Sequence, residues 1–415
     1  MKLLAFCCCL LFLIFSAWIL PFSSQASTIP DIDVNEDGYV FVSGIQPGQI
    51  HLISPYGQLI NRIQVPSSIQ SVDHLSACPC GGYLLISDTA NGRALTLNDR
   101  TGNQINLFSR IQSPGSVSVS SHSTRHMAIA DLRKNSVHLF TESGSFIREI
   151  AGSTMFSEPS KIMMDRQNNL WVLDRSRGRL LRFDPRGVHT FTLQPGRNVP
   201  MRDPLDFSID YGNRIHVLEQ SGNVQVFNAQ GRHEMTRNLQ QVINARPLRF
   251  SINPSTQDYH VIASNGQYFH VRNNMSLGGS LQNLSTERVK KVIVLRIGSR
   301  IMEHVGFEMM LLEEAPFIDR ATQRSMVPIR AIAEIFGADV SWNNATRQVT
   351  IRHQNQTIVL TINSSVAHIG NRQVQMDTQP VIRNSRTFVP IRFISEAFGA
   401  NVDWIPDTQR IIIAH

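Results

Sequence analysis

Short alternating runs of apolar and polar residues dominate residues 29–290 and predict β-strands. The most apolar run recurs about every 44 residues, and another strand follows each one after a polar turn. Pairs such as Asp37-Gly38 and Gly81-Gly82 precede most of these runs, as is typical of tight hairpins. Four strands per unit at this length predict the blades of a six-bladed β-propeller. The apolar runs begin at Tyr39, Tyr83, Met127, Leu170, Ile215 and Tyr259.

The pattern changes at about residue 291 to two similar halves, about 292–352 and 357–415, which each contain one helix. Residues 326–342 and 388–404 align without a gap, and eleven of their seventeen positions are identical. The first helix places apolar residues at i, i+3, i+4 and i+7, so it has one apolar face. We therefore expect a mainly β chain, with a propeller followed by a small duplicated α+β domain. The repeated positions are Pro328, Arg330, Glu334, Gly337 and Trp342, and then Pro390, Arg392, Glu396, Gly399 and Trp404.

Each repeated residue has a structural role that its position predicts. The prolines are expected in the first helical turn, and the glycines should end each helix in a left-handed conformation. The tryptophans are expected in the core, with a platform for sugars as the alternative. The arginine and glutamate of each helix lie four residues apart, but such a pair contributes only about 0.2–0.5 kcal/mol. We expect these pairs to tie helix to sheet or half to half, and ligand binding is the alternative.

Residues 291–415 closely resemble the copper amine oxidase N-terminal-like domain, also called the stalk domain. The shared residues are the repeated Val-Pro-Ile-Arg, Glu, Phe-Gly-Ala, Val and Trp positions. This resemblance implies a stalk or attachment module of exported bacterial proteins, and it implies neither a copper site nor a catalytic quinone. Residues 87–93 and 173–179 resemble the NHL repeat, which implies a propeller but no particular activity.

The first 26 residues are predicted to be a signal peptide. Lys2 precedes an apolar run from Leu3 to Phe22, and Ser24-Gln25-Ala26 offers small residues for cleavage. An uncleaved membrane anchor is the alternative, because the run is about long enough to cross a bilayer. The net charge of +7 is spread along the chain, which favours envelope polyanions over nucleic acid as partners. We expect a secreted or cell-surface bacterial protein.

Residue patterns that carry catalysis are scarce in this sequence. A nucleophile elbow, a phosphate loop and a His-Glu-x-x-His helix are all missing, and no cofactor is expected. His74, Cys78 and Cys80 are weak candidates for a zinc or copper site, and a disulfide or free thiols are expected instead. The acids at the strand ends are expected to cap turns rather than to bind a metal. These recurring acids are Asp88, Asp131, Asp174 and Glu219.

Two classes of function remain open. We favour a non-enzymatic binding or scaffold protein, in which a propeller face binds a protein, peptide or glycan and the stalk attaches to the envelope. The alternative is a lactonase-like hydrolase or lyase with histidines and acids in the central channel. The side chains that line this channel should decide between the two classes. The histidines that could converge there are His74, His122, His126, His216 and His260.

Overall fold

The structure is a computed structural model of the whole chain. It describes residues 30–415 except 56, 109, 121–124, 151–153, 197–198, 255, 273–290, 305–308 and 406–408. The side chains of residues 394–396, 403 and 405 are also outside the description. The predicted signal peptide and His122 therefore lie outside the described residues. No helix in the described part of the chain is long and apolar enough to cross a membrane.

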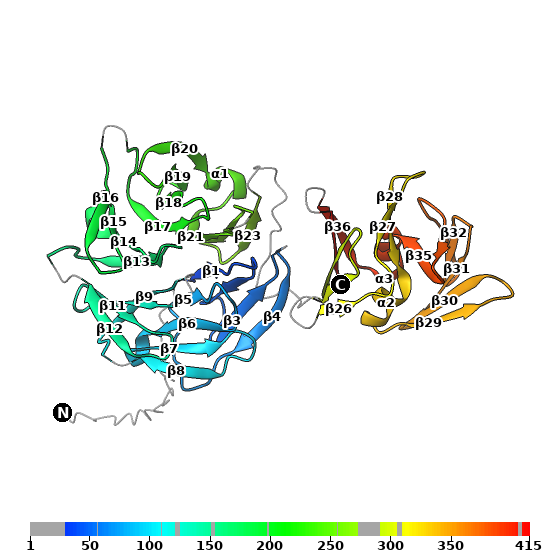
Figure 1. Cartoon of the computed structure of the whole chain (residues 1–415), viewed down its shortest axis with the longest axis horizontal. Coiled ribbons are helices and arrows are strands. Elements are labelled where there is room, and N and C mark those ends of the chain that lie inside the picture. The colour runs from blue at the N-terminus through cyan, green and yellow to red at the C-terminus, as the bar shows by residue number, and fades with distance from the viewer. Residues whose placement is uncertain are drawn as a thin grey trace, which may run out of the picture.

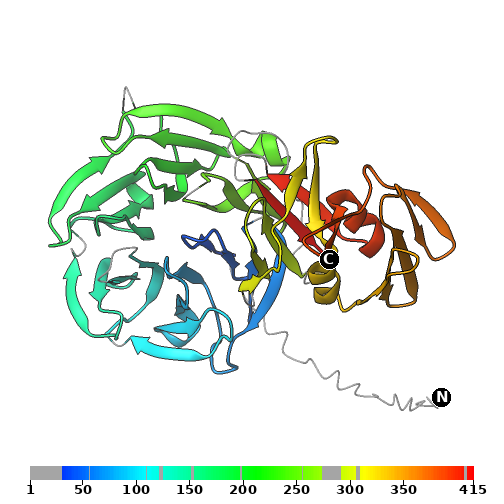
Figure 2. The same ribbon diagram turned by 45° about the vertical axis from the view of Figure 1, so that its right-hand side comes forward.

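Six antiparallel sheets follow one another along the chain and form a ring, as Figures 1 and 2 show. The predicted six-bladed propeller is thus confirmed. The first three sheets, each from the innermost strand outward, are β1 (Ile32–Val34), β2 (Val40–Val42), β3 (Gln49–Ile53) and β4 (Leu59–Gln64), then β5 (His74–Ala77), β6 (Tyr83–Asp88), β7 (Arg93–Asn98) and β8 (Gln104–Phe108), then β9 (Pro114–Val119), β10 (Met127–Asp131), β11 (Ser136–Phe140) and β12 (Phe146–Ile150).

The other three sheets repeat this arrangement, and the last has three strands among the described residues. A short helix, α1 (Leu239–Ile243), and two 3-10 turns at Thr89–Asn91 and Arg175–Arg177 were not predicted. These sheets are β13 (Pro159–Met164), β14 (Leu170–Asp174), β15 (Arg179–Phe183) and β16 (His189–Leu193), then β17 (Pro204–Ile209), β18 (Ile215–Glu219), β19 (Asn223–Phe227) and β20 (His233–Asn238), then β21 (Pro247–Ile252), β22 (Tyr259–Ala263) and β23 (Tyr268–Val271).

Side chains of the inner strands link each sheet to the next. Ser76 Oγ accepts a hydrogen bond from the Val119 amide at 3.1 Å, and Ser118 Oγ accepts one from the Met164 amide at 2.9 Å. The partners lie 43 and 46 residues apart, which is about one blade. Ser251 donates to the Asp33 carboxylate at 3.2 Å and so joins the last sheet to the first. Since inner strands of neighbouring sheets are not paired with each other, these bonds satisfy backbone donors that would otherwise be buried without partners.

The chain after residue 291 forms three further sheets and two helices. The helices α2 (Ile329–Ile335) and α3 (Ile391–Phe398) begin one residue after the repeated prolines, which end strands instead of lying inside the helices. The sheets are β26 (Met309–Leu311), β25 (Ile301–His304), β24 (Val292–Arg296), β37 (Arg410–Ala414) and β36 (Asn401–Ile405), then β27 (Phe317–Asp319), β28 (Arg324–Pro328), β35 (Arg386–Pro390) and β34 (Val381–Arg383), then β29 (Asp339–Asn343), β30 (Gln348–His353), β31 (Gln356–Thr361), β32 (Val366–Ile369) and β33 (Arg372–Gln375).

The two halves of this C-terminal part exchange their last hairpins. Strands β36 and β37 of the second half complete the sheet of β24, while β29 and β30 of the first half complete the sheet of β31. The third sheet joins both halves through β28 and β35. Neither half therefore closes its own sheet, and one shared core contains apolar residues of both. As expected, Gly337 and Gly399 follow the helices with φ of 79° and 64°, which is the left-handed region that glycine adopts at little cost.

The C-terminal sheet of β24 and β37 packs against the first two blades. Along β24, Ile293 and Leu295 face the C-terminal core, while Val292 and Val294 join the apolar cluster between the first two blades. Strand β37 alternates in the same way: Ile411 and Ile413 face the C-terminal core, and Ile412 faces the blades. The Tyr39 hydroxyl also donates to the Glu303 carboxylate at 2.7 Å. A sheet buried on both faces thus joins the two parts of the chain.

The prediction that both repeated tryptophans lie in the core is wrong. Trp342 and Trp404 are each 39% exposed. They pair with the buried residues Val349 and Ile411, so they lean toward the core, but β29 and β36 are edge strands with no neighbour beyond them. Their outer faces stay uncovered for this reason, and the alternative of a sugar platform is not removed.

Candidate functional site

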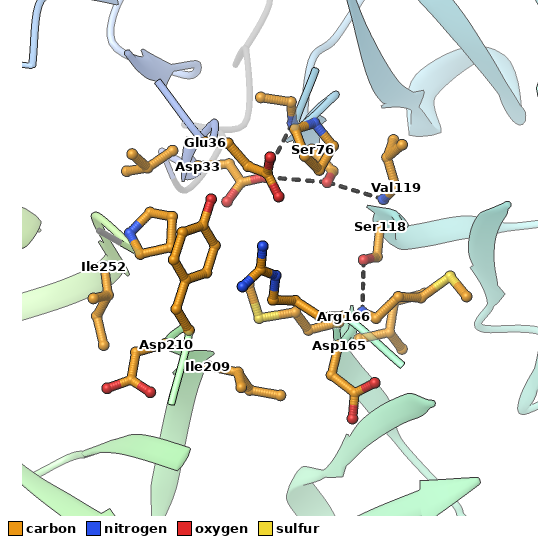
Figure 3. Close-up of a pocket in the computed structure, with 18 of the residues that line it drawn as sticks. Asp33, Glu36, Ser76, Ser118, Val119, Asp165, Arg166, Ile209, Asp210 and Ile252 are labelled. Carbon is orange, nitrogen blue, oxygen red and sulfur yellow. Dashed lines mark hydrogen bonds between the residues drawn. The ribbon is translucent and has the colours of Figure 1, made fainter. Parts of the chain in front are cut away.

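A pocket lies at one end of the propeller channel, and all six blades contribute to it. Its walls come from the inner strands β1, β5, β9, β13, β17 and β21 and from the loops that follow them. The cavity measures about 80 Å³, whereas one water needs roughly 10–15 Å³. The pocket therefore has room for a small ligand or for one end of a larger one. Figure 3 shows the residues around it.

A buried group of charges closes the channel below the pocket. Lys161 Nζ lies 3.3 Å from Asp31 Oδ1, and its side chain is 12% exposed. Asp33 lines the pocket with Lys161, while Asp206 is fully buried deeper in the channel. Asp31 also accepts the Leu75 amide at 3.1 Å and lies 3.5 Å from His74 Nδ1. The Lys161 ammonium thus interacts electrostatically with several carboxylates that come from different blades.

The charges of this group are set by burial and by Lys161. Burial alone would raise the pKa of Asp31, but Lys161 and His74 outweigh it and hold the pKa well below its usual range. Burial raises the pKa of Asp33 and of Asp206, and Lys161 opposes the rise only in part. Burial would lower the pKa of Lys161, yet the carboxylates, Asp31 above all, raise it. The ammonium is therefore charged at neutral pH.

Two further carboxylates in the pocket wall are already saturated with donors. Asp165 accepts the indole N–H of Trp171 at 3.0 Å and the backbone N–H of Asn169 at 2.9 Å. Asp210 accepts two guanidinium bonds from Arg214 at 2.7 and 2.8 Å. Burial would raise the pKa of Asp210, but hydrogen bonds from His216 and Arg214 lower it to about 2. These acids hold the loops of the pocket in place and have little capacity left for a ligand.

Two further charged side chains, Arg166 and Glu36, lie at the mouth of the pocket. The Arg166 guanidinium lies 4.0 Å from the ring centroid of Tyr211, and such stacking fixes its direction. Figure 3 shows this guanidinium pointing into the middle of the pocket. Glu36 lies in the loop after β1, and its backbone N–H donates to the Pro79 carbonyl at 3.3 Å. The side chains of Glu36 and Arg166 make no ion pair with any described residue.

Of the five histidines proposed for a catalytic channel, the four that the structure describes do not converge. His216 and His260 lie on second strands, where their rings bond the hydroxyls of Tyr259 and Tyr268 at 2.8 and 2.7 Å. Burial lowers the pKa of both rings. His74 contacts Asp31, and His126 lies at the start of β10, away from the pocket walls. Asp33 and Lys161 nevertheless line the pocket. The enzyme alternative therefore gains no support from the four described histidines, but other titratable groups remain.

The weak metal candidates are engaged elsewhere. Cys78 and Cys80 form a disulfide with a Cα–Cα distance of 5.3 Å, so they offer no thiolate in this state. The described residues contain no group of three or more His, Cys, Asp or Glu side chains arranged to hold a metal. The disulfide confirms one of the two states expected for these cysteines.

The recurring acids at the strand ends cap loops, as predicted. Asp88 accepts the backbone N–H groups of Gln70 and Ser71 at 3.2 and 3.1 Å, and Asp174 accepts those of Ser157 and Glu158 at 3.2 Å each. Asp131 and Glu219 make equivalent bonds. Each acid binds the loop that enters the inner strand of its own sheet. These acids therefore lie at the end of the strands opposite the pocket.

The repeated arginines of the C-terminal part have different partners from those expected. Arg330 and Glu334 are both exposed and form no ion pair with each other. In the second half, Arg392 pairs with Asp377 at 2.8 Å, and Arg324 of the first half reaches the same carboxylate at 3.1 Å. Helix is thus tied to loop, and half to half, through an acid outside the repeated motif. The side chain of Glu396 lies outside the described residues.

Lys161, Arg166 and Glu36 were not identified from the sequence. Lys161 of β13 lies where β9 has the short polar residue Ser116 and where β21 has Arg249. An alignment of the inner strands would have shown a long cationic side chain at this position in two of them. Arg166 and Glu36 lie in loops, where no period marks them.

Comparison with known proteins supports the expected C-terminal part of the chain. Residues 284–413 match the family model described as Copper amine oxidase N-terminal domain. The expected resemblance of the C-terminal part to this family is thereby confirmed, and the name of the family denotes a non-catalytic part of the amine oxidases. A protein named "Protease inhibitor" from Brevibacillus choshinensis is 24% identical over 136 residues, which are 33% of this chain and 38% of that protein.

Solved propellers resemble the chain at low identity. A streptogramin B lyase is 16% identical, with 62% of this chain and 82% of that chain covered and a TM-score of 0.45. Virginiamycin B lyase from Staphylococcus aureus is 13% identical, with 79% and 93% covered and a TM-score of 0.44. A nidogen/laminin complex is 12% identical, with 57% and 90% covered and a TM-score of 0.48. These likenesses assign no activity, and a propeller joined to a stalk-like domain fits a binding or scaffold role.

Proposed function

We propose that this chain is an exported, non-enzymatic binding protein of the bacterial cell envelope. The propeller pocket binds the ligand, and the C-terminal part serves as the stalk. One observation carries the proposal: the structural acids are saturated by protein donors, while Glu36 and Arg166 at the mouth have no ion-pair partner among the described residues. Unpaired polar groups that converge on one concave site are typical of ligand binding.

The proposed attachment rests on the family match and on charge. The basic balance of the chain suits anionic polymers of a cell wall, and the shared sheet of β24 and β37 would transmit attachment rigidly to the propeller. Cosedimentation of the mature full chain with envelope fragments, with and without added salt, tests this part. A chain that stays in solution at low salt would remove the attachment role.

Photo-crosslinking tests the binding role of the pocket. A photoreactive amino acid at Asn213, which lines the mouth, should capture a ligand from envelope extract. The same group at the exposed Glu234 of β20 is the matched control, and Arg166→Gln should reduce capture at Asn213. Equal capture at both positions would argue against a ligand site in the pocket.

A propeller hydrolase or lyase is the second candidate. It is favoured by the raised pKa of Asp33, a partly exposed acid in the pocket floor next to the Lys161 ammonium. An acid whose pKa is raised in this position is a candidate for donating a proton to a ligand. Mass spectrometry of the identified ligand before and after incubation with the protein tests this candidate. Conversion of the ligand by the native chain that is lost in Asp33→Asn would establish an enzyme.

A further inference from the structure

Two opposite charges at the mouth of the propeller pocket are left for the ligand. Arg166 enters from the loop after β13, and Glu36 from the loop after β1. Neither side chain has an ion-pair partner among the described residues, and they do not pair with each other although they line one pocket. Stacking on Tyr211 at 4.0 Å orients the guanidinium. A ligand at the mouth of the pocket therefore meets one fixed cation and one separate anion, while Asp33 and Lys161 lie in the floor.

The inner strands that bound the pocket offer few free hydrogen-bonding side chains near these charges. Their serines Ser76 and Ser118 already accept backbone N–H groups. The apolar side chains of these strands are buried in the clusters between blades, so they shape the pocket but do not bind the ligand. These apolar residues are Val117, Val119, Ile162, Met164 and Ile252.

We infer that the pocket binds a short amphoteric peptide, with a free amine on Glu36 and a free carboxylate on Arg166. This inference rests on the proposed binding function and names its ligand class. A simple anion would satisfy Arg166 but would leave the Glu36 carboxylate partly desolvated and next to a like charge. A neutral glycan would leave both charges without counter-charges, which is costly when water is displaced. A molecule that carries both charges leaves neither group unpaired.

Titration calorimetry with one peptide in three forms tests the inference. The probe is Ala-Leu-Ala with both ends free, N-acetylated, or C-amidated, added to the mature full chain. We expect the free form to bind and either block to weaken binding at least tenfold. In Glu36→Gln the N-acetylated and free forms should bind alike, and in Arg166→Gln the amidated and free forms should bind alike. Glu234→Gln and Arg133→Gln, at exposed positions outside the pocket, should keep both differences.

The possible failures separate the ligand class from the binding function. Equal binding of all three forms would overturn the amphoteric ligand and would leave the pocket as a binding site. No binding of any form, with capture at Asn213 still observed, would also overturn the ligand class alone. Loss of capture as well would overturn the proposed function. Circular dichroism of each variant shows that the propeller is folded, which is expected because both side chains are at least partly exposed.

Discussion

Replacement of Lys161 by methionine should strongly destabilise the propeller. Methionine keeps the length of the side chain but removes the ammonium that lies 3.3 Å from Asp31. Asp31 and Asp206 are about 1% exposed or less, so neither can exchange the lost partner for bulk water. Removal of one member of a buried ion pair typically costs about 3–5 kcal/mol. The loss is large beside the roughly 5–15 kcal/mol by which folded proteins are stable.

The cost of Lys161→Met should shrink at acid pH. In the native protein the pKa of Asp31 is lowered, so its contribution to stability is present above the unfolded pKa and is lost as the pH falls below it. Loss of Lys161 removes the strongest charge that opposes burial at Asp31 and leaves His74 and Arg249 against it, so the pKa of Asp31 rises from its native value. The pKa values of Asp33 and Asp206, which burial already raises, rise further. A buried acid with a raised pKa binds its proton at a higher pH in the folded state than in the unfolded state. The free energy of unfolding of the variant should therefore increase as the pH falls toward 5.

Urea unfolding of the mature chain at pH 7 and pH 5 measures both effects. Lys134→Met, at an exposed position in the turn after β10, is the matched control and should change the free energy of unfolding by less than about 0.5 kcal/mol. A loss below about 1 kcal/mol at pH 7 for Lys161→Met would refute the buried ion pair. An equal loss at both pH values would refute the assignment of the cost to ionised carboxylates.

Three other predictions follow from the fold. The mature chain should react with a thiol reagent only after reduction, because Cys78 and Cys80 are bonded, and zinc binding tighter than micromolar would contradict this. Tyr39→Phe should reduce the unfolding free energy by about 1–2 kcal/mol, since it removes a hydrogen bond to the Glu303 carboxylate; an unchanged denaturation midpoint would contradict it. Ile413→Ala should lower the free energy of unfolding by about 2–5 kcal/mol, because Ile413 is fully buried in β37. The control Ile301→Ala should lower it far less in the same assay, because Ile301 is 52% exposed.

Local patterns were enough to predict the kinds of element and the number of blades. The alternation of apolar and polar residues and the repeated turns each act within a few residues, so the sequence displays them directly. The helices of the C-terminal part followed from the same kind of information, apart from the start at Ile329 and Ile391, one residue later than expected. Edge position decides the exposure of Trp342 and Trp404, and edge position is a property of the assembled sheet.

Pairings between distant segments could not be predicted in this way. Lys161 and Asp31 are 130 residues apart, and the exchange of hairpins leaves the local pattern of each half unchanged. One distant contact did have a sequence pattern that pointed to it. The uninterrupted apolar run Ile411–Ala414 is typical of a strand buried on both faces, which β37 is. The pocket charges had no such pattern, because loop residues follow no period.

The central position of β37 has a consequence for the order in which the chain folds. This strand follows all the other described strands along the chain, yet it lies in the middle of its sheet, between β24 and β36. During synthesis, the sheet that covers the first blade remains incomplete until β37 has emerged. The apolar flank of an otherwise finished propeller is therefore uncovered through the whole production of the C-terminal part. A nascent chain of this protein would need protection from aggregation until β37 has been made.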